Sequence, residues 1–116
     1  MKITRLYTGQ DGESHFEDLD IPLEEKAVAD RRSKFLKAAG IIFRETSSEY
    51  DLDYHNAPRR QFVITLEGYV DIIVADGTKR RFGPGDIMLA EDTKGRGHIS
   101  RAMNNQPRKC LFVTLE

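Results

Sequence analysis

The chain has 116 residues, of which 39% are hydrophobic and 32% charged, and 18 Lys and Arg against 19 Asp and Glu leave a net charge of -1. This length suits one domain of ordinary size, and the composition excludes both a disordered segment and a membrane protein. A near-neutral charge disfavours a dedicated nucleic-acid binder, so we expect neither nucleic-acid nor membrane partners.

The single cysteine and the first residues indicate the cellular compartment. Cys110 cannot close an intrachain disulfide, and it lies in the apolar run 110–113, which favours a buried thiol. The opening MKITRLYTGQDGES lacks the apolar segment of a signal peptide, and no apolar run approaches the roughly 20 residues of a membrane helix. We therefore expect a cytoplasmic protein.

Residues 1–39 have a mixed pattern. Residues 2–7 predict a strand, and a turn-rich stretch separates them from a weaker strand at 14–21. Residues 22–30 contain good helix formers behind Pro22, which predicts one or two helical turns. No linker or repeat divides the chain, so we expect a single domain over 1–116.

From Gly40 onward the chain alternates short strand patterns with turn signals. Asp76-Gly77 and the run 83–86 are strong turn sequences. The predicted strands are 40–46, 50–55, 61–66, 69–75, 86–91, 98–103 and 109–115. Strands of this length and spacing are typical of an all-β sandwich or barrel.

Two of these strands alternate clearly enough to assign faces. In 50–55 the pattern places Tyr50, Leu52 and Tyr54 on one face and Asp51, Asp53 and His55 on the other. In 61–66 it turns Gln61, Val63 and Thr65 inward and Phe62, Ile64 and Leu66 outward. The outward apolar set then needs cover from a second sheet or from a partner subunit.

Two segments, 54–68 and 82–98, resemble the two sequence motifs of the cupin superfamily. His55 matches the first histidine of the first motif, and Gly68 matches its last glycine. Gly85 matches the start of the second motif, and Gly95 with His98 matches its Gly-x2-His part after an insertion of two residues. The resemblance covers roughly residues 40–116. It implies a cupin-type double-stranded β-helix, the jelly-roll barrel.

The departures from these motifs weaken the metal site that the resemblance implies. Ala57 stands where the family has its second histidine, and Gln61 stands where it has a glutamate. Glu49, Glu91 and Ala102 replace three further motif residues. The donors that remain are His55, Gln61 and His98, fewer and weaker than a catalytic metal centre usually has. We expect a weakly held divalent metal (iron, manganese, nickel or zinc) or no metal.

Four further residues are candidates for ligand binding. Asp53 lies two residues before His55 and either shares its interior or stays an exposed acid at the rim. Thr65 is on the inward face of its strand. Arg59 and Arg96 either line the barrel mouth, where guanidinium favours a carboxylate or phosphate, or form surface ion pairs. The glycine-rich run 91–97 before His98 suggests a flexible flap or a close backbone approach to a ligand.

Three functions remain open on this basis. The first is a small-molecule-binding protein, with or without a weakly held metal. The second is a metal-dependent oxygenase or isomerase acting on a small organic acid, and the third is a metal-free structural or interaction module. The missing histidine and glutamate favour binding over catalysis. The resemblance also implies a homodimer that pairs through the N-terminal strands.

Overall fold

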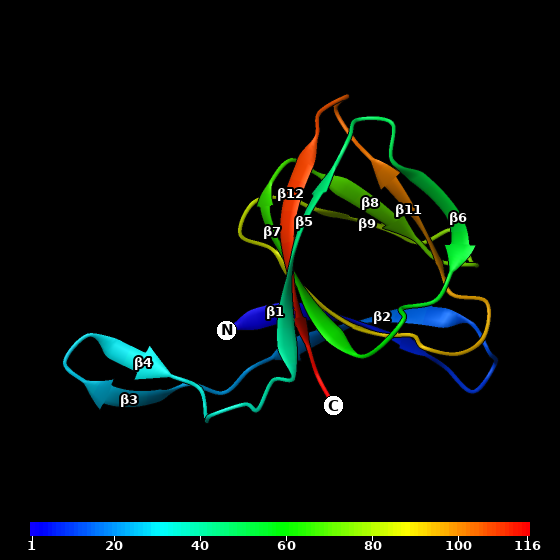
Figure 1. Cartoon of the computed structure of the whole chain (residues 1–116). Coiled ribbons are helices and arrows are strands. Elements are labelled where there is room, and N and C mark those ends of the chain that lie inside the picture. The colour runs from blue at the N-terminus through cyan, green and yellow to red at the C-terminus, as the bar shows by residue number, and fades with distance from the viewer.

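The computed structural model describes all residues from 1 to 116, and strands account for all of its regular structure (Figure 1). The first strands are β1 (Lys2–Thr8), β2 (Ser14–Asp20), β3 (Glu24–Ala27), β4 (Asp30–Arg32), β5 (Gly40–Thr46) and β6 (Asp51–His55). They are followed by β7 (Gln61–Glu67), β8 (Val70–Ile73), β9 (Lys79–Phe82), β10 (Ile87–Glu91), β11 (His98–Ala102) and β12 (Arg108–Thr114). None of these elements is a helix with the length and hydropathy that a membrane crossing requires.

Two sheets face each other and form the barrel. The larger sheet has six strands in the order β2-β1-β10-β7-β12-β5, and the smaller has four in the order β6-β11-β8-β9. A short third sheet pairs β3 with β4. The prediction of an all-β, two-sheet fold of the jelly-roll type is confirmed.

The buried face of the large sheet follows the predicted alternation of β7. Gln61, Val63 and Thr65 are 3%, 7% and 1% exposed, whereas Leu66 on the other face is 48% exposed. Successive side chains of a strand point to opposite faces, so this strand presents one wall to the barrel interior and one to the outside. The inner wall meets a core of small and medium apolar side chains, including Leu6, Val70, Ile72, Val74 and Phe82.

The N-terminal strands belong to the large sheet. β1 pairs in parallel with β10, with Leu6 opposite Ala90, and antiparallel with β2, with Leu6 opposite Phe16. Leu6 is fully buried, and the β1–β10 pairing thus brings the start of the chain into the core. The sequence predicts both N-terminal strands but not this parallel pairing.

The helical prediction for residues 22–30 is wrong. This stretch forms the hairpin of β3 and β4, with Glu24 opposite Arg32 and Glu25 opposite Arg31. Helix propensity is a weak preference that such cross-strand pairs can override. Figure 1 shows the hairpin standing clear of the barrel, on the side where the N-terminus lies.

The face assignment for residues 50–55 is also wrong, because β6 contains a bulge. His55 is opposite His98 and Leu52 is opposite Ser100, so three residue steps on β6 match two on β11. An extra residue reverses the alternation beyond it. Tyr50, Leu52 and His55 consequently all line the same cavity.

Candidate functional site

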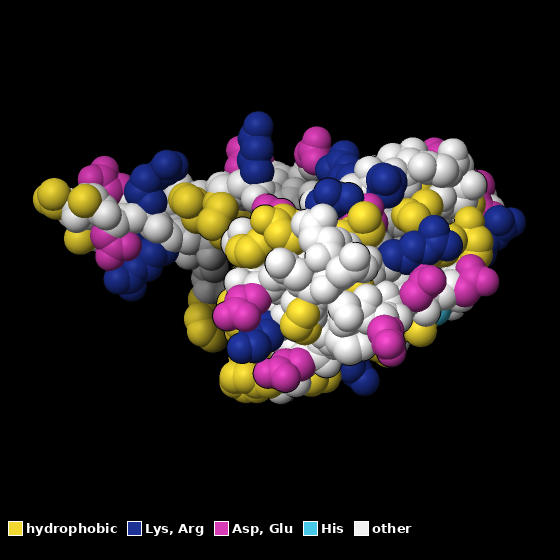
Figure 2. Space-filling model, turned by 90° about the horizontal axis from the view of Figure 1, so that it is seen from above, with side chains coloured by type: hydrophobic (Ala, Val, Ile, Leu, Met, Phe, Trp, Pro, Cys, Tyr) yellow, Lys and Arg dark blue, Asp and Glu magenta, His cyan; other side chains and the backbone are white.

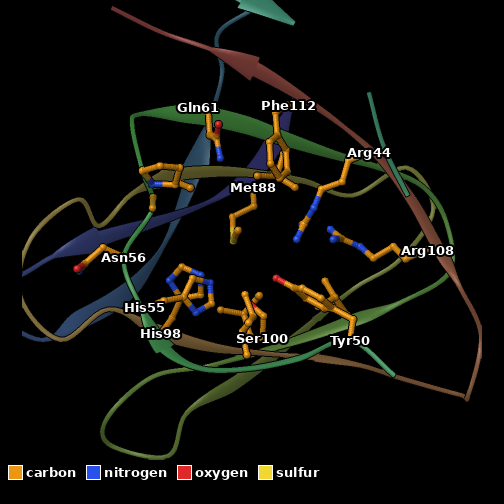
Figure 3. Close-up of a pocket in the computed structure, with 17 residues that line it drawn as sticks. Arg44, Tyr50, His55, Asn56, Gln61, Met88, His98, Ser100, Arg108 and Phe112 are labelled. Atoms are coloured by element: carbon orange, nitrogen blue, oxygen red, sulfur yellow. The ribbon is translucent and has the colours of Figure 1, made fainter. Parts of the chain in front are cut away.

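A cavity of about 250 Å³ opens between the two sheets. Its walls come from β5, β6, β7, β8, β10, β11 and β12 and from the segment before β7. About half of the lining is apolar, including Val63, Met88 and Phe112, and the polar side chains gather at two ends. Figure 3 shows two histidine rings at one end and two arginines with Tyr50 at the other. This composition is typical of a site for a small organic molecule.

The histidine end contains His55 of β6 and His98 of β11. Their ring centroids lie 4.4 Å apart with a tilt of 54° between the ring planes. Nδ1 of His55 lies 2.8 Å from the backbone carbonyl of Asp53, which fixes Nδ1 as the donor and leaves Nε2 without a proton. Burial lowers the pKa of His55 from its ordinary value, and this outweighs the opposite effect of that hydrogen bond. His55 is therefore neutral near pH 7.

A buried carboxylate orients the second ring. Nδ1 of His98 lies 2.5 Å from Oδ2 of Asp92, and the hydroxyl of Ser14 donates to the same oxygen over 2.8 Å. Asp92 is fully buried, and its Oδ1 has no hydrogen-bond partner. The His98 ring thus turns Nε2 away from the carboxylate. This is the arrangement by which carboxylates orient functional histidines in proteins.

The arginine end is the most unusual part of the site. Arg108 of β12 is only 4% exposed; one terminal nitrogen donates to Thr65 over 3.1 Å, and its Nε has no partner. Neither Arg108 nor Arg44 of β5 forms an ion pair with a carboxylate of the chain. Burial lowers the pKa of Arg108, and the charge of Arg44 lowers it further. Two cations thus face one cavity without a counter-charge.

Aromatic rings hold the second of these arginines in place. The guanidinium carbon of Arg44 lies 4.8 Å from the ring centroid of Tyr50 and 5.2 Å from that of Phe112. Stacking of this kind orients a guanidinium while leaving its N–H groups free. In Figure 3 both guanidinium groups and the Tyr50 hydroxyl point toward the middle of the cavity.

Side-chain hydrogen bonds hold the glycine-rich loop before β11 in place. The Asn56 amide donates to the carbonyls of Lys94 and Gly95, and the Thr8 hydroxyl donates to the carbonyl of Lys94. Gly97 has a positive φ of 83°, and a Cβ at this position would collide with the backbone carbonyl of His55. The close backbone approach at Gly97 is made to β6, beside the site histidine, whereas the predicted approach to a ligand stays a prediction.

The structure brings together two of the three predicted metal ligands. His55 and His98 lie side by side, but Figure 3 shows Gln61 reaching the cavity from the opposite wall, and no three His, Cys, Asp or Glu side chains are placed so that they could hold a metal ion. The amide oxygen of Gln61 is buried without a partner. Two imidazoles do not make the three-ligand set of a mononuclear catalytic centre, so these residues do not fit that metal site.

The four predicted ligand-binding residues lie outside the cavity lining. Asp53 is exposed, and its carboxylate accepts from the backbone N–H of Tyr54. Arg59 is exposed in the loop before β7, and Arg96 is exposed and paired with Glu13 over 3.2 Å. Thr65 is 1% exposed and contributes indirectly, because its hydroxyl accepts from Arg108. Asp53, Arg59 and Arg96 therefore lie away from this cavity, and their role in binding a ligand stays a prediction.

The sequence reasoning missed both cavity arginines and the buried role of Asp92. A signal for Arg108 existed, because Arg108, Cys110 and Phe112 alternate along β12, and an inward cysteine predicts an inward arginine two residues earlier. The predicted strand began one residue too late, at Lys109, to include it. No local pattern distinguishes Arg44 from the many surface arginines.

Comparisons with known proteins support the fold but assign no function. No protein-family model and no curated protein matches the chain. The crystal structure of protein NMB1881 from Neisseria meningitidis superposes with a TM-score of 0.51 at 16% identity, covering 70% of this chain and 79% of that one. SPY1581 of Streptococcus pyogenes, described as a conserved protein of unknown function, gives a TM-score of 0.49 at 18% identity, covering 72% of this chain and 71% of that one. The chain shares its all-β fold with the Neisseria protein.

Proposed function

We propose that the chain binds a small organic anion in the cavity between its two sheets. Arg44 and Arg108 hold the anionic group, because a guanidinium donates two parallel hydrogen bonds to a carboxylate. The apolar walls contact the carbon skeleton. His55 and His98 receive a second polar group at the far end, so the ligand carries a functional group at each end.

The observation that carries this proposal is Arg108, 4% exposed and unpaired. A buried charge without a counter-ion costs several kcal/mol by order of magnitude. A fold that retains this charge beside a second arginine without a counter-ion gains the most stability when an anion enters between them. An organic anion is favoured over inorganic phosphate, since much of the cavity lining offers only apolar contact.

Isothermal titration with pyruvate, succinate, malonate and inorganic phosphate tests the proposal. We expect at least one carboxylate to bind more tightly than phosphate, and Arg44→Gln and Arg108→Gln each to weaken it at least about tenfold. Arg59→Gln is the matched control, because this arginine lies outside the cavity lining, and it should leave binding unchanged. Equal affinity in the wild type and in both cavity variants would contradict the proposal.

A second candidate function, proton transfer on the bound anion, is favoured by the oriented pair His98–Asp92. In such a step Nε2 of a neutral histidine removes a proton from the carbon beside a carbonyl group. The C–H electron pair forms a C=C bond, and the carbonyl electrons move to oxygen, giving an enolate. Return of the proton to the other face of the same carbon completes an epimerisation without any co-reactant. Asp92 stabilises the imidazolium that forms in between.

Deuterium exchange distinguishes this second function from simple binding. The methyl protons of pyruvate, followed by NMR in D2O, should exchange about a hundredfold faster with the protein than with free imidazole at equal concentration. His98→Gln should abolish the acceleration, and Asp92→Asn should reduce it while shifting its pH profile. Binding without accelerated exchange would exclude proton transfer on this probe and leave anion binding as the function.

A further inference from the structure

The two ends of the cavity differ in hydrogen-bond polarity as well as in charge. At one end, Arg44 and Arg108 offer only N–H groups, because a guanidinium has donors and no acceptor. At the other end lie the two histidines, and the lining of the cavity contains no Asp or Glu. This asymmetry restricts the group that a bound anion can place at the histidine end.

His55 is the clearest hydrogen-bond acceptor of the site. A neutral imidazole carries one proton, and His55 uses it at Nδ1, which donates to the carbonyl of Asp53 over 2.8 Å. Nε2 is therefore left with a lone pair and no proton. Asp92 holds a proton on Nδ1 of His98 in the same way, so the neutral form of that ring also has an acceptor at Nε2.

Gln61 and Ser100 add polar groups to the same lining. Gln61 is 3% exposed, and its amide oxygen is a buried acceptor to which no group of the protein donates. Ser100 follows His98 by two positions on β11, so both side chains are on the same face of the strand and line the cavity. A hydroxyl such as that of Ser100 both donates and accepts. A ligand that brings a donor to these walls therefore meets more than one acceptor.

Among common functional groups, a hydroxyl suits the histidine end best. The oxygens of a second carboxylate, or of a carbonyl, only accept, and they would face the lone pair of His55 Nε2. An ammonium group donates, but its positive charge would enter a cavity that already holds two arginines and has no Asp or Glu in its lining. A hydroxyl supplies the missing donor without adding a charge.

We infer that the anion bound in this cavity is a hydroxycarboxylate, whose carboxylate lies between Arg44 and Arg108 and whose hydroxyl donates to Nε2 of His55. The inference rests on the anion binding proposed above and adds the identity of the second functional group. The cavity volume of about 250 Å³ equals that of about eight water molecules, so the ligand has about eight non-hydrogen atoms.

Calorimetric titration with acids that share one carbon chain is the first test. The series is 4-hydroxybutyrate, butyrate, succinate and 4-aminobutyrate, and the same comparison with chains of three and five carbons scans the distance between the two ends. We expect the hydroxy acid of at least one length to bind at least about tenfold more tightly than its three analogues, because a site that hydrogen-bonds a hydroxyl rejects ligands lacking it. Figure 2 shows basic side chains close to acidic ones over most of the face in view, so no extended basic patch there competes for the anion.

The outcome of this series separates the inference from the function on which it rests. An analogue that binds as tightly as the best hydroxy acid, and that Arg108→Gln still weakens, would overturn the hydroxyl and leave anion binding intact. Failure of every acid to bind would contradict both.

A single variant tests the acceptor itself. His55→Phe keeps a ring in the cavity wall but removes the nitrogen that accepts, so the preference for the hydroxy acid over its unsubstituted analogue should fall at least about tenfold. The affinity for the unsubstituted acid should stay the same. His15→Phe is the matched control, because His15 lies outside the cavity lining and pairs with Asp11, and it should leave the preference unchanged. A preference that survives His55→Phe, or equal losses for both acids, would overturn the role of His55.

Nitrogen-15 NMR of the histidine rings tests the same contact in the wild-type protein, independently of whether a variant folds. Near pH 7 the Nε2 signal of His55 should have the chemical shift of an unprotonated nitrogen. It should move upfield when the hydroxy acid binds, as the lone pair accepts a hydrogen bond, and should not move with the unsubstituted acid. A protonated Nε2 in the free protein, or the same shift with both acids, would overturn the inference.

Discussion

Arg108 contributes more to a binding site than to the stability of the empty protein. The residue is 4% exposed, and burial lowers the pKa of its guanidinium. The hydroxyl of Thr65 is the one hydrogen-bond partner of its side chain within the protein. Residues retained against a local cost in stability commonly belong to functional sites.

Replacing this charge by an apolar side chain of similar length should therefore separate stability from binding. We expect Arg108→Met to raise the free energy of unfolding by about 1 kcal/mol, because it removes a buried charge that has no counter-ion and whose Nε has no hydrogen-bond partner. The same variant should lose affinity for the organic anion. Chemical denaturation and calorimetric titration of the same samples provide the two measurements. A variant that is both less stable and unchanged in binding would contradict this account of Arg108.

His55 makes stability depend on pH in a defined direction. Its folded pKa is lowered by burial, so between that value and the ordinary pKa of about 6.5 the unfolded chain binds more protons than the folded one. The contribution of His55 to the free energy of unfolding is complete above pH 6.5 and is lost as the pH falls through this window. Between about pH 7 and pH 5 the wild type should lose more stability than His55→Asn, as measured by urea unfolding. Parallel losses in the two proteins would contradict this prediction.

At the level of single residues the sequence predicts part of the site. His55 and His98 match motif positions and do meet in the cavity. Their partners are harder to predict, because Asp92, which orients His98, is itself held by Ser14, 78 residues away in the chain. Asp53 is exposed, which is one of its two predicted placements, whereas one extra residue in β6 turns His55 into the cavity.

The elements around the site are held by backbone contacts as much as by side chains. Gly97 lies directly against the carbonyl of His55, where no Cβ can be accommodated, and its φ is positive. The loop containing it begins at Asp92 and ends at His98, so it fixes the spacing of the orienting pair. A change here should move both histidines at once.

We expect Gly97→Ala to destabilise the protein by about 1–3 kcal/mol, because the new Cβ meets backbone atoms that cannot move aside cheaply. NMR signals of the His55 and His98 rings should shift together. Gly77→Ala is the matched control, because that glycine also has a positive φ of 88° but has open space around its Cβ position. If the two variants behaved alike, the close approach to β6 would not be the cause.

Among the elements, strands with regular alternation can be predicted from the sequence. An element whose local propensity is overridden by its tertiary contacts cannot. Most strands from β5 to β12 lie within a few residues of the predicted ranges, because alternation and turn signals are local. The strand β9 (Lys79–Phe82) was not predicted, since Lys79-Arg80-Arg81 reads as a charged surface run. Residues 22–30 have helix formers but form a hairpin, and the local sequence contains no signal for it.

For the molecule as a whole, the cavity chemistry predicts stabilisation by an anion rather than by a metal. A carboxylate present at about a hundredfold its dissociation constant should add about 2.7 kcal/mol to the free energy of unfolding. Treatment with EDTA should leave the melting temperature unchanged, because the two imidazoles lack a third protein ligand. Differential scanning calorimetry measures both effects. A melting temperature that falls with EDTA and returns with added zinc, iron, nickel or manganese would instead indicate a bound metal.

The position of β12 has a consequence for how the chain acquires its structure. β12 follows the other eleven strands in the chain, yet it lies inside the large sheet between β7 and β5. Until β12 pairs, β5 has no neighbour in that sheet. The cavity wall that Arg108 and Cys110 contribute from β12 is also missing until then. Folding must therefore wait for contacts between distant parts of the chain, which makes it slow compared with a helical protein of this size. During that wait the exposed edges of β5 and β7 offer a route to aggregation.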